Sequence, residues 1–363
     1  MDKIQDYVRW RGDLDFGVRP LATEDIVVLC SLMYCPWEEL QELDYRGRCL
    51  GQLNRWIYQK GKLPKNAAGW QKKLHALWQE IPEYPRFADI RLADFMATTF
   101  DDEESQIAAA VFEIDGDERG DLAVVAFRGT DTTVSDWKES LEIGHHGLLP
   151  ARNIALDYLN AALAKYERVY VCGHSKGGNL AMYSAAHADN QDRIAWIYNL
   201  DGPGLDKDSY DNNWTDIEER VTTIIPYGST IGVMMGYGAN YSVVSASVKG
   251  LGQHDTFTWE FDGPHLNYLE KMSTKSRVVG KTLHRFLEST SEDDRRLVID
   301  TVRRLADTAE TDDTNDLAKS IAKRAPKIIK HIRNIDEEDK AALKDLSKKL
   351  IEHGVQTIKN EDL

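Results

Sequence analysis

The sequence Gly-His-Ser-Lys-Gly-Gly at residues 173–178 constrains the fold of this chain more than any other segment. It follows an apolar stretch of β type at residues 169–172, and a run typical of a helix comes directly after it, at residues 179–186. A Gly-x-Ser-x-Gly turn between a buried strand and a helix holds its serine in a strained conformation, which only small flanking residues permit. The amides of the following helix point at the same place and can hold a developing negative charge. The pattern therefore predicts a nucleophile elbow with Ser175 at its tip.

Strands and helices alternate on both sides of this turn. Two β-rich runs are joined by an Asp- and Gly-rich connection that predicts a hairpin, with strands at residues 106–114 and 121–127. A helix is expected at residues 151–166 and another at 275–287, and further strands at 168–172, 194–200, 222–226 and 241–248. This alternation is typical of an α/β fold with a mostly parallel central sheet and helices on its faces.

Helical patterns occupy both ends of the chain. Apolar positions recur at helical intervals over residues 23–43, 48–58 and 69–81, so we expect a helical N-terminal region, residues 1–100, packed on a core of residues 101–290. Residues 291–363 read as a charged helical C-terminal extension. Part of it carries an apolar stripe, at Ile321, Ile328, Ile329 and Ile332, which could pack on the main domain or join two copies into an oligomer.

Composition limits the partners and the compartment of the chain. Its net charge of −15 and pI near 5.2 argue against nucleic acid as a partner, because phosphate binding needs clustered Lys and Arg. The N-terminus is charged throughout, which argues against a secretory signal, and no segment has the ~18 uninterrupted apolar residues that a membrane span needs. The four cysteines lack metal-type spacing. We therefore expect a cytoplasmic protein with free thiols, no metal and no cofactor.

A serine hydroxyl becomes a nucleophile only when a nearby imidazole removes its proton, so a histidine must approach Ser175. In a sheet of this type the base arrives on a loop after a late strand, on the C-terminal side of the serine. His254 lies in a glycine-rich loop just after the strand expected at 241–248 and is the best candidate. His265, in a Gly-Pro-His sequence, is the reserve.

The third group needed is a carboxylate that orients the imidazole and stabilises its charged form. Asp201 directly follows the strand expected at 194–200, and catalytic residues of open α/β sheets collect at the carboxyl ends of strands. A Gly-Pro-Gly loop follows it, so the aspartate could also serve the turn alone. Asp206, Asp255 and Asp262 are the competing choices, although Asp255 adjoins the histidine and would more naturally cap a turn.

Acyl transfer also needs hydrogen-bond donors for the tetrahedral oxyanion. One expected donor is the amide of Lys176, the residue after the serine. The second is Thr130, in the sequence Phe-Arg-Gly-Thr-Asp at the end of a predicted strand, where a turn can aim its amide and hydroxyl at the site. The same residue could equally cap the turn.

Together these motifs resemble the class 3 lipases of the α/β-hydrolase fold over about residues 85 to 265. The Arg-Gly-Thr loop at 128–130, the elbow at 173–181 and the late histidine carry the resemblance. A closer resemblance is to a bacterial group of lipase-like proteins classed as a domain of unknown function, whose pattern extends to residues 6–7, 25–34, 201–204, 225–232, 253–255 and Trp259. The resemblance implies an ester hydrolase with Ser175 as nucleophile, His254 as base and Thr130 at the oxyanion hole.

Two departures from the lipase pattern leave the function open. Lipases place the acid between the proline-containing strand and the histidine, where this chain has Tyr-Gly-Ser at 227–229; this favours Asp201 as the acid. Lys176 places a long cation where lipases commonly have a smaller residue, which would suit a negatively charged substrate group. A silent binding module and an acyltransferase are the alternatives to an esterase. A glycine- and methionine-containing segment at 232–238 could form an apolar flap, and the expected substrate is a small-molecule or lipid ester.

Overall fold

A nine-stranded sheet organises the molecule, here described from a computed structural model. The structure describes residues 1–40, 43–58, 63, 67–99, 106–117, 120–129, 149–205, 214–235, 241–291, 293–294, 297 and 337–360. The strand order is β1-β2-β3-β4-β5-β6-β7-β8-β11. The bounds are β1 Arg48–Cys49, β2 Arg91–Thr99, β3 Gln106–Asp117, β4 Gly120–Phe127, β5 Val169–His174, β6 Ile194–Leu200, β7 Val221–Pro226, β8 Tyr241–Val244 and β11 Tyr268–Leu269.

Strands β4 to β8 are parallel to one another, and the strands toward both edges pair antiparallel. A separate pair, β9 (Phe261–Asp262) and β10 (His265–Leu266), lies outside this sheet. Because β4 to β8 run in one direction, their carboxyl ends meet at one edge of the sheet. Loops that follow these strands are therefore brought together there.

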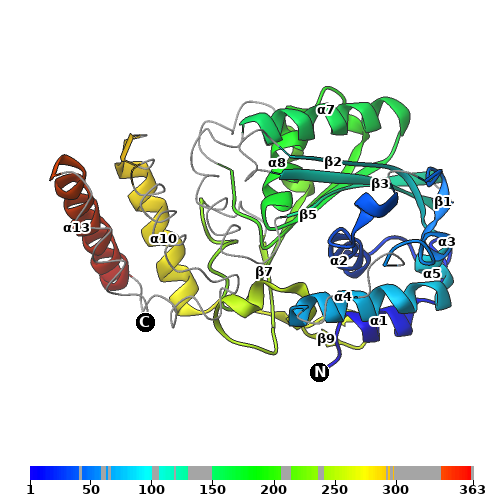
Figure 1. The fold of residues 1–363 in the computed structure, drawn as a ribbon. Helices are drawn as coiled ribbons and strands as arrows, with labels where there is room; N and C mark the ends of the chain where they lie inside the picture. Colours follow the sequence, from blue (N-terminus) through cyan, green and yellow to red (C-terminus); the bar gives the residue numbers. More distant parts are fainter. Residues whose placement is uncertain are drawn as a thin grey trace.

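Helices cover both faces of the sheet (Figure 1). Helices α7 (Leu149–Lys165) and α8 (Lys176–His187) lie on one face. The N-terminal layer lies on the other, and consists of α1 Ile4–Arg11, α2 Thr23–Leu32, the 3-10 helix η1 Trp37–Leu40, α3 Leu50–Leu53, α4 Gly69–Glu80, η2 Ile81–Glu83 and α5 Pro85–Ala88. The predicted α/β fold, with a helical N-terminal cover over the sheet, is confirmed.

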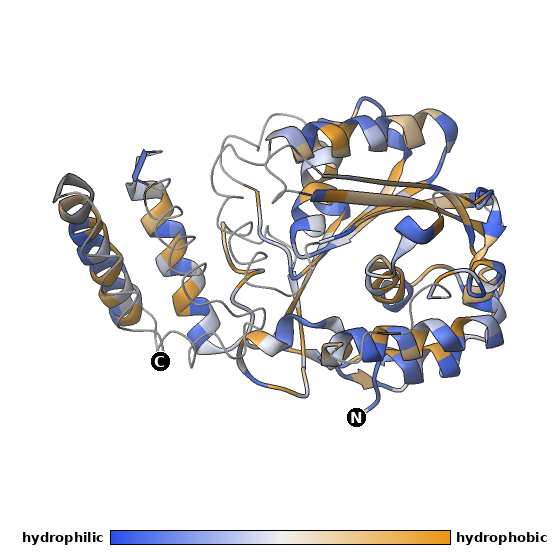
Figure 2. Cartoon of the chain, in the orientation of Figure 1, coloured by the Kyte–Doolittle hydropathy of each residue, from blue (hydrophilic) through white to orange (hydrophobic). Residues whose placement is uncertain are grey.

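The alternation of side chains along the strands divides the core into two halves. Val124 and Ala126 of β4 pack against the N-terminal layer, whereas Val125 and Phe127 pack against α7 and α8. Successive residues of a strand point to opposite faces, so a strand buried on both sides is apolar throughout. Figure 2 shows this continuous apolar character along the central strands and in α2, which is buried between the sheet and the other N-terminal helices.

The C-terminal part that the structure describes is a helix pair. Helix α10 (Thr274–Ser289) lies beside α13 (Glu337–Asn360) (Figure 1). Two hydrogen bonds join them: the Arg285 guanidinium donates to the Thr357 hydroxyl at 2.9 Å, and Ser289 Oγ and His353 Nε2 lie 2.9 Å apart. Short helical segments also connect the strands, among them η4 (Gln191–Arg193), α9 (Trp214–Ile217) and η6 (Glu218–Arg220). The apolar stripe expected around residues 321–332 lies outside the described residues.

Several expectations for the first hundred residues differ from the structure. Residues 91–99 belong to the sheet as β2, so the helical region ends before residue 91 rather than at 100. Residues 48–58 begin with the edge strand β1 before the short helix α3. The helix expected at 23–43 ends at Leu32 and resumes only as η1. Strands β1 and β2 depend on pairing with distant segments, which local periodicity does not reveal.

All four cysteines, Cys30, Cys35, Cys49 and Cys172, are free thiols. Within the described ranges, no helix combines the length and the apolar character needed to cross a bilayer.

Candidate active site

Ser175 sits at a sharp turn between β5 and α8, as the sequence predicts. Strand β5 ends at His174, helix α8 begins at Lys176, and Ser175 between them has φ 57° and ψ −130°. This is a costly conformation for a residue with a side chain. The turn also needs Gly177, because a Cβ there would overlap the carbonyl oxygen of Phe127 in β4. The backbone is thus compressed around the serine, at the start of a helix.

Asp201 occupies the equivalent place on the neighbouring strand. The amide of Ser175 donates to the Leu200 carbonyl at 3.0 Å, and the amide of Asp201 donates to the Ile224 carbonyl at 2.8 Å. Hydrogen bonds therefore pass from β5 to β6 to β7 just where the strands end. Asp201 also has a positive φ, 46°, which is uncommon for a residue other than glycine. Strained residues cluster at functional sites, and here two such residues terminate adjacent strands.

The carboxylate of Asp201 is buried and accepts hydrogen bonds on both oxygens. Oδ2 lies 2.7 Å from Nδ1 of His254. Oδ1 accepts from the Ser229 hydroxyl at 2.5 Å and from the Gly232 amide at 3.1 Å. Because the carboxylate holds Nδ1–H, Nε2 is the nitrogen of His254 that remains for proton exchange. The structure thus brings together the aspartate and the histidine that the sequence singled out.

The turn that carries His254 is braced from two sides. It forms the 3-10 helix η7, Gly250–His254. The side-chain oxygen of Gln253 accepts from the Gly228 amide at 2.8 Å, and the main-chain oxygen of Gln253 accepts from the indole N–H of Trp259 at 2.8 Å. Both bonds tie η7 to neighbouring segments, so His254 is presented from a fixed backbone.

His174, the residue before the serine, packs against His254. The centroids of their rings lie 4.4 Å apart, and Nε2 of His174 lies 2.8 Å from the main-chain oxygen of His254. Nδ1 of His174 lies 2.8 Å from the hydroxyl of Tyr34. Burial lowers the pKa of His174 well below its usual value, and the nearby charge of His254 lowers it further. His174 is therefore neutral near pH 7.

The competing candidates lie elsewhere. Asp255 caps the 3-10 helix η8 (Thr256–Thr258) by accepting from the Phe257 amide at 2.9 Å, as its position after His254 led us to expect. Asp262 is exposed on β9, and Asp206 lies outside the described residues. The side chain of His265 is 65% exposed and faces Glu24 at 3.6 Å. Neither Asp262 nor His265 shares a hydrogen bond with the Ser175, Asp201 and His254 group among the contacts of the described residues.

The expected oxyanion donors are placed only in part. Lys176 provides the first amide of α8, directly after the serine. Thr130 lies outside the described residues, but its neighbour Gly129 is close to the elbow: a Cβ on Gly129 would come within 3.0 Å of Cβ of Ser175 and 2.5 Å of the His174 carbonyl oxygen. The end of β4 therefore lies directly against the serine.

The side chain of Lys176 does not behave as expected for a substrate-binding cation. It is 1% exposed, and its ammonium group donates to the main-chain oxygen of Gln106, at the start of β3, at 2.6 Å. A buried ammonium that is hydrogen-bonded to the backbone satisfies a structural need. The idea that Lys176 recruits a negatively charged substrate group is thus not supported by its placement.

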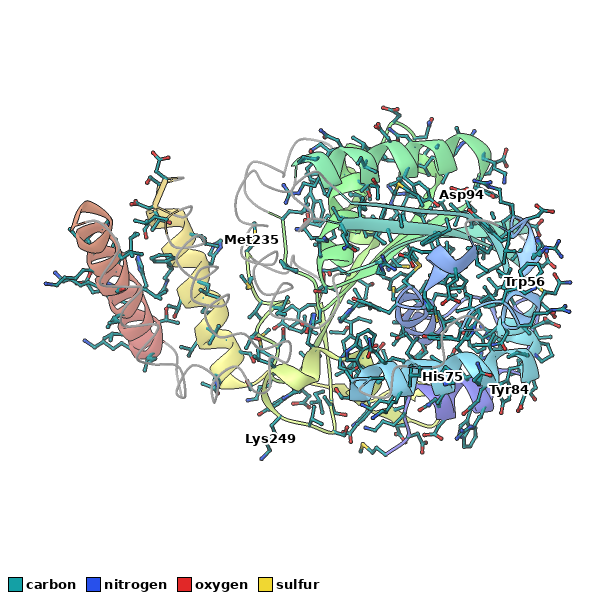
Figure 3. All side chains as sticks on the ribbon, viewed as in Figure 1. Trp56, His75, Tyr84, Asp94, Met235 and Lys249 are labelled. Atoms are coloured by element: carbon teal, nitrogen blue, oxygen red, sulfur yellow. The ribbon has the colours of Figure 1, made fainter. Side chains whose placement is uncertain are left out.

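The segment expected to form an apolar flap is part of the core in its described half. Val233, Met234 and Met235 are buried, and the last two pack with the cluster beneath α7 and α8. Figure 3 shows Met235 between the sheet and α10. Residues 236–238 lie outside the described residues.

Sequence reasoning gave no role to four residues that hold this site: Tyr34, His174, Ser229 and Gly232. All four fall inside the segments that carried the family resemblance, so a signal was present. Ser229 and Gly232 contact Asp201, His174 contacts His254, and Tyr34 contacts His174 across 140 residues of sequence, so only the tertiary structure shows these contacts.

In the described part of the chain, no three His, Cys, Asp or Glu side chains converge so as to hold a metal ion.

Comparison with known proteins identifies a family. A family model described as Mbeg1-like matches residues 81–303, which is more than half of the chain and includes Ser175, Asp201 and His254. Among solved structures, the chain is similar to one titled as a crystal structure of fungal lipases, with 10% sequence identity, 70% of this chain and 91% of that chain covered, and a TM-score of 0.40. No curated protein gives a significant sequence match.

Proposed function

Because the chain belongs to the Mbeg1-like family and has a lipase-like α/β-hydrolase fold, we propose that it is a serine hydrolase acting on carboxylic esters. The observation that carries this proposal is the 2.7 Å contact of Asp201 with His254, beside a serine held at φ 57°. A binding module has no need of either feature. The lack of a carboxylate between the proline-containing strand and the histidine suggested a protein without catalytic activity. In the proposed site Asp201, at the end of β6, supplies this carboxylate instead.

In the proposed mechanism Ser175 is the nucleophile and His254 is the base. Nε2 of His254 takes the proton from Oγ of Ser175 as this oxygen bonds to the ester carbonyl carbon. The resulting imidazolium is stabilised by the carboxylate of Asp201 through Nδ1–H. His254 then gives the proton to the departing alkoxide, so the alcohol leaves and an acyl-serine remains. A water molecule, deprotonated by the same nitrogen, then attacks the acyl-serine carbonyl. The bond to Ser175 Oγ breaks, His254 returns the proton to this oxygen, and the carboxylic acid leaves.

The negative charge on the carbonyl oxygen is assigned to backbone donors. The amide of Lys176 lies at the N-terminus of α8, where the helix dipole favours negative charge. Thr130 is proposed as the second donor, since Gly129 before it packs against the elbow. Each such donor typically contributes about 3 kcal/mol to the stabilisation of the transition state.

Two properties of Asp201 support its role as the acid. The Ser229 hydroxyl and the Gly232 amide both donate to Oδ1, so Oδ2 is directed at His254. A carboxylate fixed in this way can hold Nδ1–H and stabilise the imidazolium that forms when Nε2 takes the proton. The cytoplasmic location and an ester substrate of small-molecule or lipid type remain predictions from the sequence.

A fluorophosphonate probe tests the proposal, because it reacts only with an activated serine. We expect the wild type to be labelled at Ser175 and to hydrolyse short p-nitrophenyl esters. Ser175→Ala should lose both properties while keeping its fold. Ser184→Ala is the matched control: this serine lies buried on the same helix, and its hydroxyl donates to the Leu180 carbonyl at 2.8 Å. An unlabelled wild-type protein, shown to be folded by circular dichroism, would overturn the proposal.

A further inference from the structure

His174 has both ring nitrogens engaged, and their partners determine where its proton lies. Nε2 lies 2.8 Å from the main-chain oxygen of His254, and a carbonyl oxygen only accepts hydrogen bonds. Nε2 must therefore carry the proton. Nδ1 then has a lone pair, which accepts from the hydroxyl of Tyr34 at 2.8 Å. The Tyr34 hydroxyl thus favours the one tautomer of His174 that can hold His254.

His254 is consequently held at three points. Asp201 binds Nδ1 at 2.7 Å, His174 binds the main-chain oxygen, and the His174 ring lies against the His254 ring with an angle of 34° between their planes. Orienting a base in this way contributes to catalysis, since misplacement by about 1 Å can lower a rate roughly 100-fold. Two of the three restraints come from His174.

His174 must stay neutral in order to orient His254. An imidazolium at His174 would place a second cation beside His254 just as His254 accepts the proton from the serine. Burial lowers the pKa of His174 well below its usual value, and the charge of His254 adds to the effect. His174 therefore keeps its neutral Nε2–H tautomer through the catalytic cycle.

Tyr34 brings the N-terminal layer into the site. It follows helix α2 closely, and its ring meets the edges or faces of Trp70 and His174 at centroid distances of 6.0 Å and 5.8 Å. A Cβ on Gly129 would overlap the Tyr34 hydroxyl, so this oxygen is fitted closely between β4 and the elbow. The N-terminal layer thus reaches His254 indirectly, through the Tyr34 hydroxyl and the His174 ring.

We propose that Tyr34 and His174 are positioning residues for the base: the Tyr34 hydroxyl selects the Nε2–H tautomer of His174, and this N–H holds the backbone of His254. The inference rests on the proposed function of His254, but the tautomer of His174 can be measured without an activity assay. The N-terminal layer is then required for turnover as well as for stability.

The tautomer is tested by nitrogen NMR on protein labelled with ¹⁵N-histidine, assigned with His174→Gln. We expect His174 in the wild type to be neutral at pH 7 with its proton on Nε2. Tyr34→Phe should raise the fraction of the Nδ1–H tautomer, because only the His254 carbonyl then still favours a proton on Nε2; an unchanged tautomer would show that the Tyr34 hydroxyl does not select it. A wild-type His174 that is charged, or protonated on Nδ1, would overturn the inference whether or not the protein is an enzyme.

Steady-state kinetics test whether Tyr34 contributes to turnover by positioning His254. Tyr34→Phe should lower kcat about 10-fold or more with little change in KM, because orientation of the base and not ester binding is affected. Tyr45→Phe is the matched control: it also removes a buried hydroxyl of the N-terminal layer, one that donates to the Phe95 carbonyl at 3.1 Å, away from the site. It should reduce stability by a similar amount and leave kcat unchanged.

A pair of variants separates positioning from packing. His174→Gln keeps an amide donor that can reach the His254 carbonyl, whereas His174→Leu fills the space without a donor. We expect Gln to retain more activity than Leu. The inference fails if His174→Leu is at least as active as His174→Gln, or if Tyr34→Phe and Tyr45→Phe have the same kcat. In either case His174 serves packing alone. The proposed function still stands in that case, provided that the fluorophosphonate probe labels Ser175.

Discussion

Replacing Asp201 with asparagine changes one atom at the centre of the site, and the contacts around it determine how the new amide must lie. The Gly232 amide donates to Oδ1 at 3.1 Å, and a backbone N–H cannot become an acceptor. The asparagine oxygen must therefore take the place of Oδ1, which turns its NH2 group toward Nδ1 of His254. His254 then has to accept on Nδ1 and carry its proton on Nε2. In this tautomer it cannot take the proton of Ser175.

Two free-energy costs determine how far kcat should fall in Asp201→Asn. Reversing the amide would set its NH2 group against the Gly232 N–H and leave a buried donor unsatisfied, at a cost of about 1–3 kcal/mol, so roughly 1–10% of molecules would hold the active tautomer. Loss of the charge-assisted hydrogen bond to the imidazolium costs a further ~1.5–3 kcal/mol. Together these predict a decrease in kcat of about 10² to 10⁴-fold, and the corresponding substitution in serine proteases lowers kcat by about 10⁴.

The assay is hydrolysis of p-nitrophenyl butyrate at saturating substrate, together with the rate of fluorophosphonate labelling and a thermal melt. Asp255→Asn is the matched control, because this carboxylate adjoins His254 in sequence but contacts the Phe257 amide and, at 3.4 Å, Lys73. We expect it to keep its kcat. The reasoning is refuted if Asp201→Asn retains more than a tenth of the wild-type kcat, or if Asp255→Asn loses as much activity as Asp201→Asn.

Two predictions concern stability. The pKa of His174 in the folded chain lies well below its unfolded value near 6.5. Below pH 6.5 the unfolded chain therefore binds a proton that the folded chain does not. The free energy of unfolding should then fall by up to ~1.4 kcal/mol for each pH unit below 6.5, whereas above pH 6.5 His174 adds no pH dependence. Urea denaturation from pH 7.5 to 5 should show this slope, and His174→Gln should show a shallower one; equal slopes would contradict the assignment. Arg86 forms a buried, two-pronged ion pair with Asp25 at 2.8 and 2.6 Å, so Arg86→Met should destabilise the fold by about 3–5 kcal/mol through the unpaired carboxylate. Asp25→Asn combined with Arg86→Met should recover part of this loss, and equal stability of the single and double variants would contradict the explanation.

Elements with a strong local signal could be predicted closely from the sequence. Strand β6 has the predicted bounds, and β5, α8 and α10 differ from expectation by a few residues at most. Strand β2 was missed because its sequence, Arg-Leu-Ala-Asp-Phe-Met-Ala-Thr-Thr, mixes polar and apolar residues without a regular period. It forms a strand because β3 offers a long antiparallel partner. Strand propensity depends on such neighbours, and a single segment does not contain them.

The sequence by itself determined the nucleophile elbow, since a strand, a small-residue turn and a helix are all specified within residues 169–187. It also narrowed the candidate base to His254, with His265 in reserve, and the candidate acid to a few aspartates. Only the tertiary structure placed Asp201, and not Asp255, against His254, because 53 residues separate the pair and the parallel pairing of β6, β7 and β8 brings the segments after these strands together. The same pairing placed Ser229 and Gly232 around Asp201, and the packing of the N-terminal layer placed Tyr34 on His174. Local chemistry is encoded in neighbouring residues, whereas the approach of distant groups depends on how whole strands align and layers pack.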